Sequence, residues 1–275
     1  MVTPATAANH SRDTRVSAAT TPALTASGVT VRFGGLTALD AIDVEVEPGT
    51  TVGLVGPNGA GKTTLFNVLS GLLRPNEGTV DLAGRDVTRL SPTVRARRGL
   101  ARTYQRSELF TELTVRENLV LAYRARRRNH HLALDLLGLG RRRDRQEDET
   151  VDGLLESLRL IEVAGEPADG LPLGTGRLVE VGRALAAEPD IVLLDEPSAG
   201  LDEHETDLLA DALRRARLDS TVAFLLVEHD VDLVLGLSNH VYVLDFGRCI
   251  AAGPPEAIRS DPAVRAAYLG TQVET

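Results

Sequence analysis

The sequence predicts an α/β fold whose core is interrupted by a helical segment. Three runs of apolar residues, "TTVGLVG", "DIVLLDEP" and "STVAFLLVEHD", have the length and β-branched content of buried strands. Segments with helical spacing lie between these runs, and this alternation is typical of α/β proteins. From about residue 106 to residue 180 strand-like runs are absent and helix-like periodicity dominates. We therefore expect a helical insertion in an α/β core, without an internal repeat.

The first predicted elements begin at about residue 25. Residues 1–24 are rich in Ala, Thr and Ser and have no periodicity, so we expect a disordered extension there. "GVTVRF" begins strand character, and "IDVEVEPG" alternates apolar and acidic residues before a Pro-Gly turn. "TTVGLVG" leads into a glycine-rich stretch, after which "KTTLFNVLSGLL" has helical spacing. "GTVDLAGRDV" follows the turn "RPNEG" and is predicted to be a strand or a hairpin edge.

The later elements divide into the insertion and the returning strands. "LTVRENLVLAYRARRR" and "VDGLLESLRLIEVAG" have the periodicity of amphipathic helices. After the two buried runs that end in "DEP" and "VEHD", "HVYVLDFGRCIAAG" is predicted to be a hairpin that turns at Asp245-Phe246-Gly247. "PAVRAAYLG" closes the chain as a short helix. The predicted organisation is one domain over residues 25–270 with an insertion over about residues 106–180.

Composition excludes several classes of protein. The chain has 275 residues, 43% of them hydrophobic and 25% charged, which is an ordinary globular profile. A net charge of −9 argues against binding nucleic acid through bulk charge, so we expect no nucleic-acid partner. Cys249 is the only cysteine, which excludes a disulfide or a multi-cysteine metal site within one chain. Because neither a membrane-spanning apolar run nor a signal-peptide core is present, we expect a cytosolic protein that reaches a membrane through a partner.

A glycine-rich stretch between a predicted strand and a predicted helix carries the clearest chemistry. "GPNGAGKT" fits G-x-x-x-x-G-K-[ST] at every fixed position. Its glycines let backbone N–H groups turn toward phosphate oxygens, and the following helix adds its positive N-terminus. Lys62 places a compact charge between β- and γ-phosphates, and the Thr63 hydroxyl would ligate Mg²⁺. The predicted nucleotide-binding residues are Gly56, Pro57, Asn58, Gly59, Ala60, Gly61, Lys62, Thr63 and Thr64.

Lys62 is also the only lysine in the sequence. Of the 30 basic residues, the other 29 (30 − 1) are arginine. A planar guanidinium does not fit a narrow phosphate cradle in place of a compact ammonium. The single lysine therefore marks the position where the two cations are not interchangeable.

Two further runs end in polar residues that suit nucleotide hydrolysis. "IVLLDEP" places Asp195 and Glu196 at the carboxyl end of a core strand, where α/β sheets bind ligands. Asp195 suits Mg²⁺ held through water, and Glu196 suits a general base. His229 lies near the end of the similar run "LLVEHD", and Gln105 in "ARTYQR" offers a neutral contact to water and metal. Read singly, the carboxylates could be solvated and the histidine structural, and the phosphate loop alone also fits GTPases and kinases.

Taken together, these motifs resemble the nucleotide-binding subunit of ABC transporters over roughly residues 25–270. The resemblance implies a P-loop NTPase (RecA-like) core with an antiparallel β subdomain and a helical insertion. "RFGGLTALD", "GLARTYQ" with "ELTVRENL", and the tail from "DFGRCIAAG" onward look like the ATPases of branched-chain amino acid uptake. Related ATPases for the transport of urea, short amides or lipopolysaccharide share many of these sequence motifs. The matching order is Phe33, the phosphate loop, Gln105, a signature segment, Asp195-Glu196, the D-loop "SAGLD" and His229.

The resemblance also implies a role for each of these positions. Phe33 would stack on the adenine of ATP. Gln105 would sense the γ-phosphate and Mg²⁺ and link to a transmembrane partner, while Asp195 and Thr63 would hold Mg²⁺. Glu196 would polarise the attacking water and His229 would contact the γ-phosphate.

The signature segment departs from the family pattern. Family members close each ATP between one chain's phosphate loop and the partner chain's signature, usually Leu-Ser-Gly-Gly-Gln. Here the segment is Leu171-Pro172-Leu173-Gly174-Thr175. Gly174 matches the family pattern and is a predicted contact to the partner's nucleotide. Pro172 stands at the serine position and has neither a hydroxyl nor an N–H group. We therefore expect a heterodimer with a second ATPase chain, with a homodimer as the alternative, bound to permease subunits on the inner face of the cell membrane.

The sequence is compatible with four functions. The first is a transport motor in which ATP hydrolysis drives a separate permease. The second is a P-loop kinase or nucleotide switch, which would need an acceptor site or switch loops in place of the signature and D-loop. The third is an ABC-type ATPase without a permease, whose known forms need two cassettes or long coiled coils. The fourth is a nucleotide-binding regulatory subunit with little activity, an alternative that Pro172 leaves open.

Overall fold

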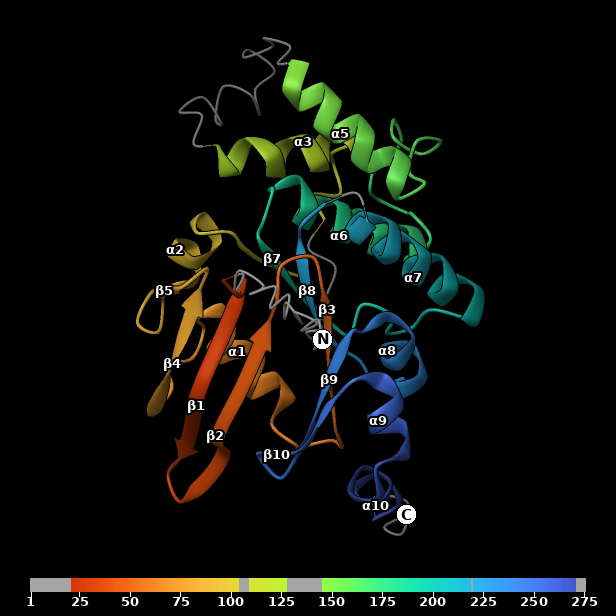
Figure 1. Ribbon diagram of the computed structural model, residues 1–275. Helices are drawn as coiled ribbons and strands as arrows, with labels where there is room; N and C mark the ends of the chain where they lie inside the picture. Colours follow the sequence, from red (N-terminus) through yellow and green to blue (C-terminus); the bar gives the residue numbers. More distant parts are fainter. Residues whose placement is uncertain (1–20, 104–108, 128–144, 219, 271–275) are drawn as a thin grey trace, which may run out of the picture.

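A computed structural model shows that the protein consists of two β-sheets and a group of helices (Figure 1). The structure describes residues 21–103, 109–127, 145–218 and 220–270. Gln105 and residues 1–20 of the predicted extension lie outside the described residues. This mixed architecture confirms the predicted α/β class.

The larger sheet has six strands in the order β10-β9-β3-β8-β7-β6. Its strands from β9 to β6 run parallel, and β10 is antiparallel to β9. Every residue of β3, β7 and β8 is buried, as is typical of a parallel sheet covered on both faces. The strands are β3 (Thr51–Val55), β6 (Leu100–Arg102), β7 (Ile191–Asp195), β8 (Ala223–Val227), β9 (His240–Asp245) and β10 (Arg248–Gly253). The predicted hairpin turn between β9 and β10 is confirmed, whereas the three-residue strand β6 is not predicted by its sequence.

The smaller sheet is antiparallel and has the order β2-β1-β4-β5. Its strands are β1 (Leu24–Phe33), β2 (Leu36–Val46), β4 (Glu77–Leu82) and β5 (Arg85–Asp86). The strand β1 starts one residue before the predicted boundary, and Ala23 and Leu24 are buried. Their place in the core corrects the extension over residues 1–24, because the Ala- and Thr-rich composition of "TPALTAS" conceals the first apolar contacts of the sheet.

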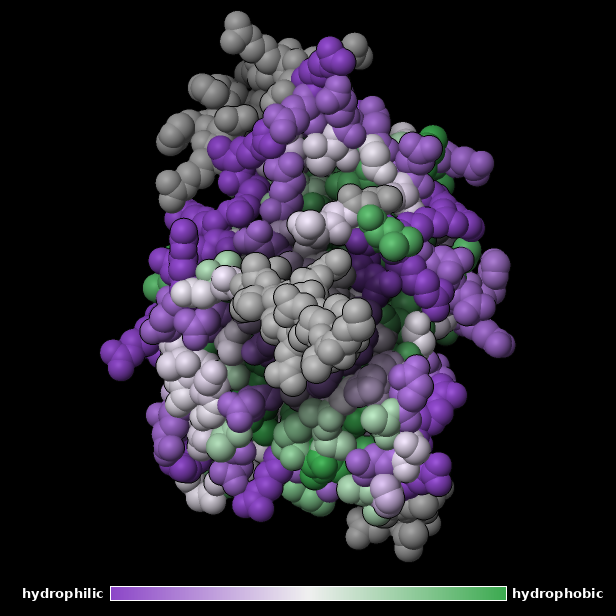
Figure 2. All heavy atoms as spheres, in the orientation of Figure 1, coloured by the Kyte–Doolittle hydropathy of each residue, from purple (hydrophilic) through white to green (hydrophobic). Residues whose placement is uncertain are grey.

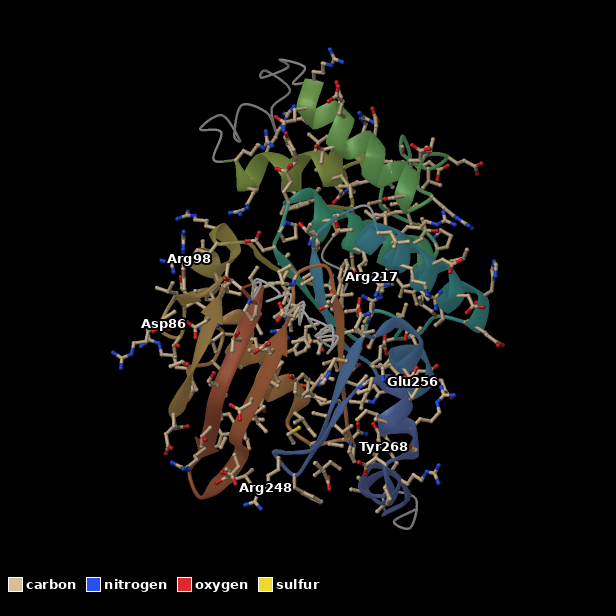
Figure 3. The ribbon with its side chains drawn as sticks, viewed as in Figure 1. Asp86, Arg98, Arg217, Arg248, Glu256 and Tyr268 are labelled. Atoms are coloured by element: carbon tan, nitrogen blue, oxygen red, sulfur yellow. The ribbon has the colours of Figure 1, made fainter. Side chains whose placement is uncertain are left out.

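The two sheets meet at the turn between β9 and β10. The N–H of Asp40 in β2 donates to the carbonyl of Gly247, at 2.8 Å. The carboxylate of Asp40 forms an ion pair with Arg248, at 2.9 Å from Oδ2 to Nη2. Arg248 is the first residue of β10 and is labelled in Figure 3. The N–H of Gly247 in turn donates to the carbonyl of Ala60 in the phosphate loop, at 3.0 Å, so the turn holds β2 beside this loop.

Side-chain alternation along the central strands divides the core into two layers. In β7, Val192 and Leu194 pack with α3, α6 and α7, whereas Ile191 and Leu193 pack with α1 and the smaller sheet. The helices are α1 (Lys62–Ser70), α2 (Pro92–Arg97), α3 (Val115–Arg126), α5 (Arg145–Ser157), α6 (Leu173–Ala186), α7 (Glu203–Leu218), α8 (Val231–Leu237), α9 (Pro255–Ser260) and α10 (Pro262–Gly270). Of the helices described, none has the length and apolar character needed to span a membrane.

The predicted insertion corresponds to the helices at the top of Figure 1. Both α3 and α5 lie within it, and α6 begins in it but continues past the predicted end at about residue 180 to Ala186. The helix α5 ends at Ser157, before the end of its predicted segment, and Arg159 has a left-handed φ of 58°. This helical end presents a mostly hydrophilic surface, while hydrophobic residues gather lower on the same face, around β9 and β10 (Figure 2).

Candidate nucleotide-binding site

The loop between β3 and α1 needs glycine because the chain passes close to other backbone. Gly56 has φ 151°, and a Cβ there would lie 2.1 Å from the carbonyl oxygen of Leu244. At Gly61, with φ 104°, a Cβ would lie 2.8 Å from the carbonyl oxygen of Ala38. A side chain at either position would displace the loop. The loop therefore keeps the bare backbone surface that a phosphate group requires.

The helix α1 begins at Lys62, directly after this loop, and no side chain caps its N-terminus. The Lys62 ammonium folds back onto the loop and donates to the carbonyls of Gly56 and Pro57, at 2.5 and 3.0 Å. Burial lowers the pKa of Lys62, and the nearby carboxylate of Glu196 acts in the opposite direction. The only lysine of the chain is thus a buried cation held by oxygens of the phosphate loop.

An open cleft of about 530 Å³ lies over this loop. The predicted aromatic residue, Phe33, forms part of its wall and is 52% exposed, which leaves its ring available to a ligand. Phe246, in the turn after β9, lines the same cleft and was not predicted as a site residue. The lining consists of Phe33, Leu36, Thr37, Ala38, Asn58, Gly59, Ala60, Gly61, Lys62, Thr63, Thr64, Glu196, His229, Phe246 and Gly247.

The structure brings two predicted residues from different strands into contact. Glu196 follows β7, has a left-handed φ of 48°, and donates its N–H to the carbonyl of Val227 in β8. Its Oε1 lies 2.8 Å from Nε2 of His229, which follows β8. Both side chains line the cleft, as does Lys62. A carboxylate oriented by an imidazole beside a phosphate loop can accept a proton from a water molecule there.

Sequence reasoning missed a buried carboxylate behind this pair. Glu228 is 3% exposed, and its carboxylate accepts from the N–H groups of Ser198, at 2.6 Å, and His229, at 3.2 Å. Burial raises the pKa of Glu228. Its side chain joins the loop after Glu196 to the end of β8. The signal in the sequence was an acidic residue directly after the buried run "FLLV".

Asp195 lies deeper than Glu196, at the buried end of β7. Its Oδ2 accepts from Nη2 of Arg102 in β6, at 2.7 Å, and it is not part of the cleft lining. Gly174 also lies outside the cleft, in the first turn of α6, where its N–H donates to Oε1 of Glu205 at 3.2 Å. Neither Arg102 nor Glu205 was predicted as a site residue.

Comparisons with known proteins agree with this geometry. A family model described as "ABC transporter" matches residues 39–199, which include the phosphate loop, Asp195 at the end of β7 and Glu196 after it. The chain belongs to the ABC transporter family. A second model, "Branched-chain amino acid ATP-binding cassette transporter", matches residues 248–274 of this ABC protein. The predicted resemblance is confirmed.

Several relatives of this ABC protein match over nearly their whole length. It is 41% identical to the high-affinity branched-chain amino acid transport ATP-binding protein BraF of Pseudomonas aeruginosa, over 90% of this chain and 98% of the relative. It is 40% identical to the protein of the same description, LivG, of Escherichia coli, with the same coverage. Among solved structures, MJ1267, an ATP-binding cassette of an ABC transporter, has a TM-score of 0.76 and 31% identity, over 90% and 98% of the two chains. The protein is accordingly an ATPase that binds and hydrolyses ATP.

Proposed function

We propose that this ABC ATPase powers the uptake of branched-chain amino acids, or of closely related small solutes, through separate permease subunits. The site supports this proposal through the contact between Glu196 and His229 beside the phosphate loop. The match of residues 248–274 and the names of the relatives support the substrate class. We assign the residues from Leu24, where β1 begins, to about residue 270 to one ATPase domain with a helical subdomain, preceded by an extension.

In this proposal each residue of the cleft has a distinct role toward ATP. Phe33 stacks on adenine, where its exposed ring forms one wall of the cleft. Lys62 leaves the carbonyls of Gly56 and Pro57 and pairs with the β- and γ-phosphates, which are stronger acceptors. Glu196 takes a proton from the attacking water, and His229 orients Glu196 and reaches the γ-phosphate.

The donors beside the phosphate loop fit Mg²⁺. Thr63 offers a hydroxyl in the cleft, and Asp195 offers a carboxylate at the end of β7. Both are oxygen donors of the kind that Mg²⁺ prefers, and we propose Gln105 as a third. When bound, the ion neutralises negative charge on the β- and γ-phosphates.

We further propose that the working assembly contains a second, different ATPase chain and permease subunits on the inner face of the cell membrane. Pro172 supports this arrangement because it offers no donor to a nucleotide on a partner chain. The alternative, a regulatory subunit with little activity of its own, rests on the same residue. ATPase activity with and without a co-purified permease separates the two functions.

The test of the proposed function is leucine uptake into proteoliposomes that contain the chain with its co-purified membrane partners. We expect uptake that depends on ATP. Uptake of urea or amides in place of leucine would overturn the substrate class.

A second measurement tests the general base. Glu196→Gln should slow ATP hydrolysis by roughly 10²–10⁴-fold, the range for loss of a general base. Nucleotide binding should persist in this variant. Full hydrolysis by Glu196→Gln would place the base elsewhere.

A further inference from the structure

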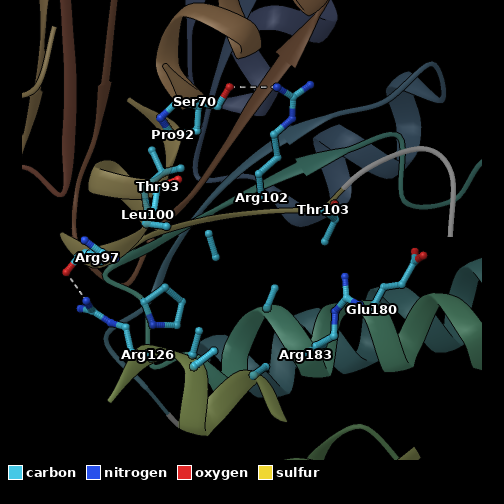
Figure 4. Close-up of a pocket in the computed structure, with 17 residues that line it drawn as sticks. Ser70, Pro92, Thr93, Arg97, Leu100, Arg102, Thr103, Arg126, Glu180 and Arg183 are labelled. Carbon is cyan, nitrogen blue, oxygen red and sulfur yellow. Dashed lines mark hydrogen bonds between the residues drawn. The ribbon is translucent and has the colours of Figure 1, made fainter. Parts of the chain in front are cut away.

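A buried arginine outside the nucleotide cleft contacts the end of β7 and the helix that follows the phosphate loop. The side chain of Arg102, in β6, is 7% exposed. Its Nη2 donates to Oδ2 of Asp195, at 2.7 Å, and the Asp195 side chain is equally buried. Its Nη1 donates to Oδ1 of Asn67 and to Oγ of Ser70 in α1, at 2.9 and 3.0 Å. Figure 4 shows the bond to Ser70 beside the cavity between α2, α3 and α6.

These contacts link the structural elements that carry the two proposed magnesium ligands, Thr63 and Asp195. Thr63 lies in the first turn of α1, and Asn67 and Ser70 lie further along the same helix. Asp195 ends β7, which is the parallel neighbour of β6. One planar guanidinium therefore spans from the helix of Thr63 to the strand of Asp195, and its fixed fork sets their relative position.

The contact to Asp195 uses only one carboxylate oxygen. Oδ2 accepts from Arg102, and Oδ1 has no hydrogen-bond partner among the residues that the structure describes. The bond from the Arg102 guanidinium to Oδ2 is charge-assisted and restricts rotation of the carboxyl group. The other oxygen remains available to water on a metal ion.

We propose that Arg102 is a positioning residue of the magnesium site, which holds the Asp195 carboxylate in one orientation. This inference rests on the proposed role of Asp195 toward Mg²⁺. Groups that hydrogen-bond to metal ligands fix the orientation of these ligands, and their loss weakens metal binding. Arg102 does not touch the nucleotide cleft, so its loss should affect the metal more than the nucleotide.

The test is binding of Mn²⁺, as a paramagnetic substitute for Mg²⁺, to the complex of the full chain with ATP. Arg102→Met should weaken Mn²⁺ binding by roughly 10–100-fold, the range for loss of a group that orients a metal ligand. Binding of a fluorescent ATP analogue in EDTA should change little. Arg102→Lys should retain part of the Mn²⁺ affinity because an ammonium can still pair with Asp195, and this variant carries the test if Arg102→Met does not fold.

Arg95 supplies the matched control. It is fully buried and donates to the carbonyls of Val68 and Leu69 in the same helix α1, but it does not contact Asp195. Arg95→Met should lower the melting temperature without changing Mn²⁺ affinity. Equal losses of Mn²⁺ affinity in Arg95→Met and Arg102→Met would reduce Arg102 to a structural residue and overturn the proposal.

A double-variant cycle with Asp195→Asn separates this proposal from the proposed function. With Asp195→Asn in place, Arg102→Met should cause no further loss of Mn²⁺ affinity. A full further loss would show that Arg102 acts through another group and overturn the proposal alone. Unchanged Mn²⁺ affinity in Asp195→Asn itself would overturn the magnesium assignment of Asp195 and this inference with it.

Discussion

At Lys62, two carbonyl oxygens hold a cation that must move to reach a phosphate. Lys62→Ala should remove a charge-assisted contact worth about 1.5–3 kcal/mol, or roughly 10–150-fold in ATP affinity. We expect Lys62→Arg to lose nearly as much, because a planar guanidinium does not fit where Nζ lies 2.5 Å from the carbonyl of Gly56. Titration with a fluorescent ATP analogue measures both. Wild-type affinity in Lys62→Arg would contradict the shape argument.

At Glu228, burial raises the pKa of the carboxyl above its usual value near 4.5. Folding therefore favours the protonated carboxyl relative to the unfolded chain, and the stability that this difference provides is lost as pH rises from about 4.5 through the raised pKa. Glu228→Gln does not titrate, so its free energy of unfolding should improve relative to wild type between about pH 5 and about pH 8. Urea denaturation at both pH values measures this difference. A difference that is constant or shrinks with pH would contradict the sign of the pKa shift.

Among single residues, motif positions were predictable and their partners were not. The phosphate loop can be recognised from sequence because few residue types can adopt its backbone conformation and also bind a phosphate group. Nothing in the sequence selects Arg102, among 29 arginines, as the partner of Asp195 at a separation of 93 residues. The same holds for Glu205 and Gly174, which are brought together only by the packing of α6 and α7.

At the scale of elements, burial decided which strands could be predicted. The strands β3, β7 and β8 consist of buried residues and read as strands in isolation. The strand β6 has three residues, one of them Arg102, and exists because it pairs with β7. Three residues are too few to show a periodicity, so only the neighbouring strand specifies β6.

The helix α3 starts with a capping box that isolates one local contribution to stability. The Thr114 hydroxyl accepts from the N–H of Glu117, at 3.1 Å, and the Glu117 carboxylate accepts from the N–H of Thr114, at 2.9 Å. Thr114→Ala should lower the free energy of unfolding by about 1 kcal/mol, the usual value for a lost N-cap. Urea denaturation measures the change, and Thr114→Ser, which keeps the hydroxyl, should recover most of it. Equal losses in both variants would show that the Thr114 methyl group, and not the cap, carries the stability.

For the whole molecule, the start of α6 bears on assembly. In the dimer implied by the family, the γ-phosphate on a partner chain would approach Gly174, and the positive N-terminus of α6 would attract it. Here Pro172 offers no donor, and the carboxylate of Glu205 already accepts from the Gly174 N–H. A carboxylate in this place repels a phosphate. Both features oppose a homodimer and agree with the proposed second ATPase chain.

We therefore predict that the isolated chain is mainly monomeric with MgATP, and that Glu205→Gln or Pro172→Ser strengthens its self-association. Each restored or unmasked donor to a phosphate contributes on the order of 1.5–3 kcal/mol, or roughly tenfold or more in the dimer constant. Analytical ultracentrifugation with MgATP, in a Glu196→Gln background that blocks turnover, measures the constant. Glu203→Gln is the matched control, because Glu203 lies exposed in the same first turn of α7. A tight homodimer of the chain with Pro172 and Glu205 both in place would contradict this prediction, since the altered signature would then close over ATP unaided.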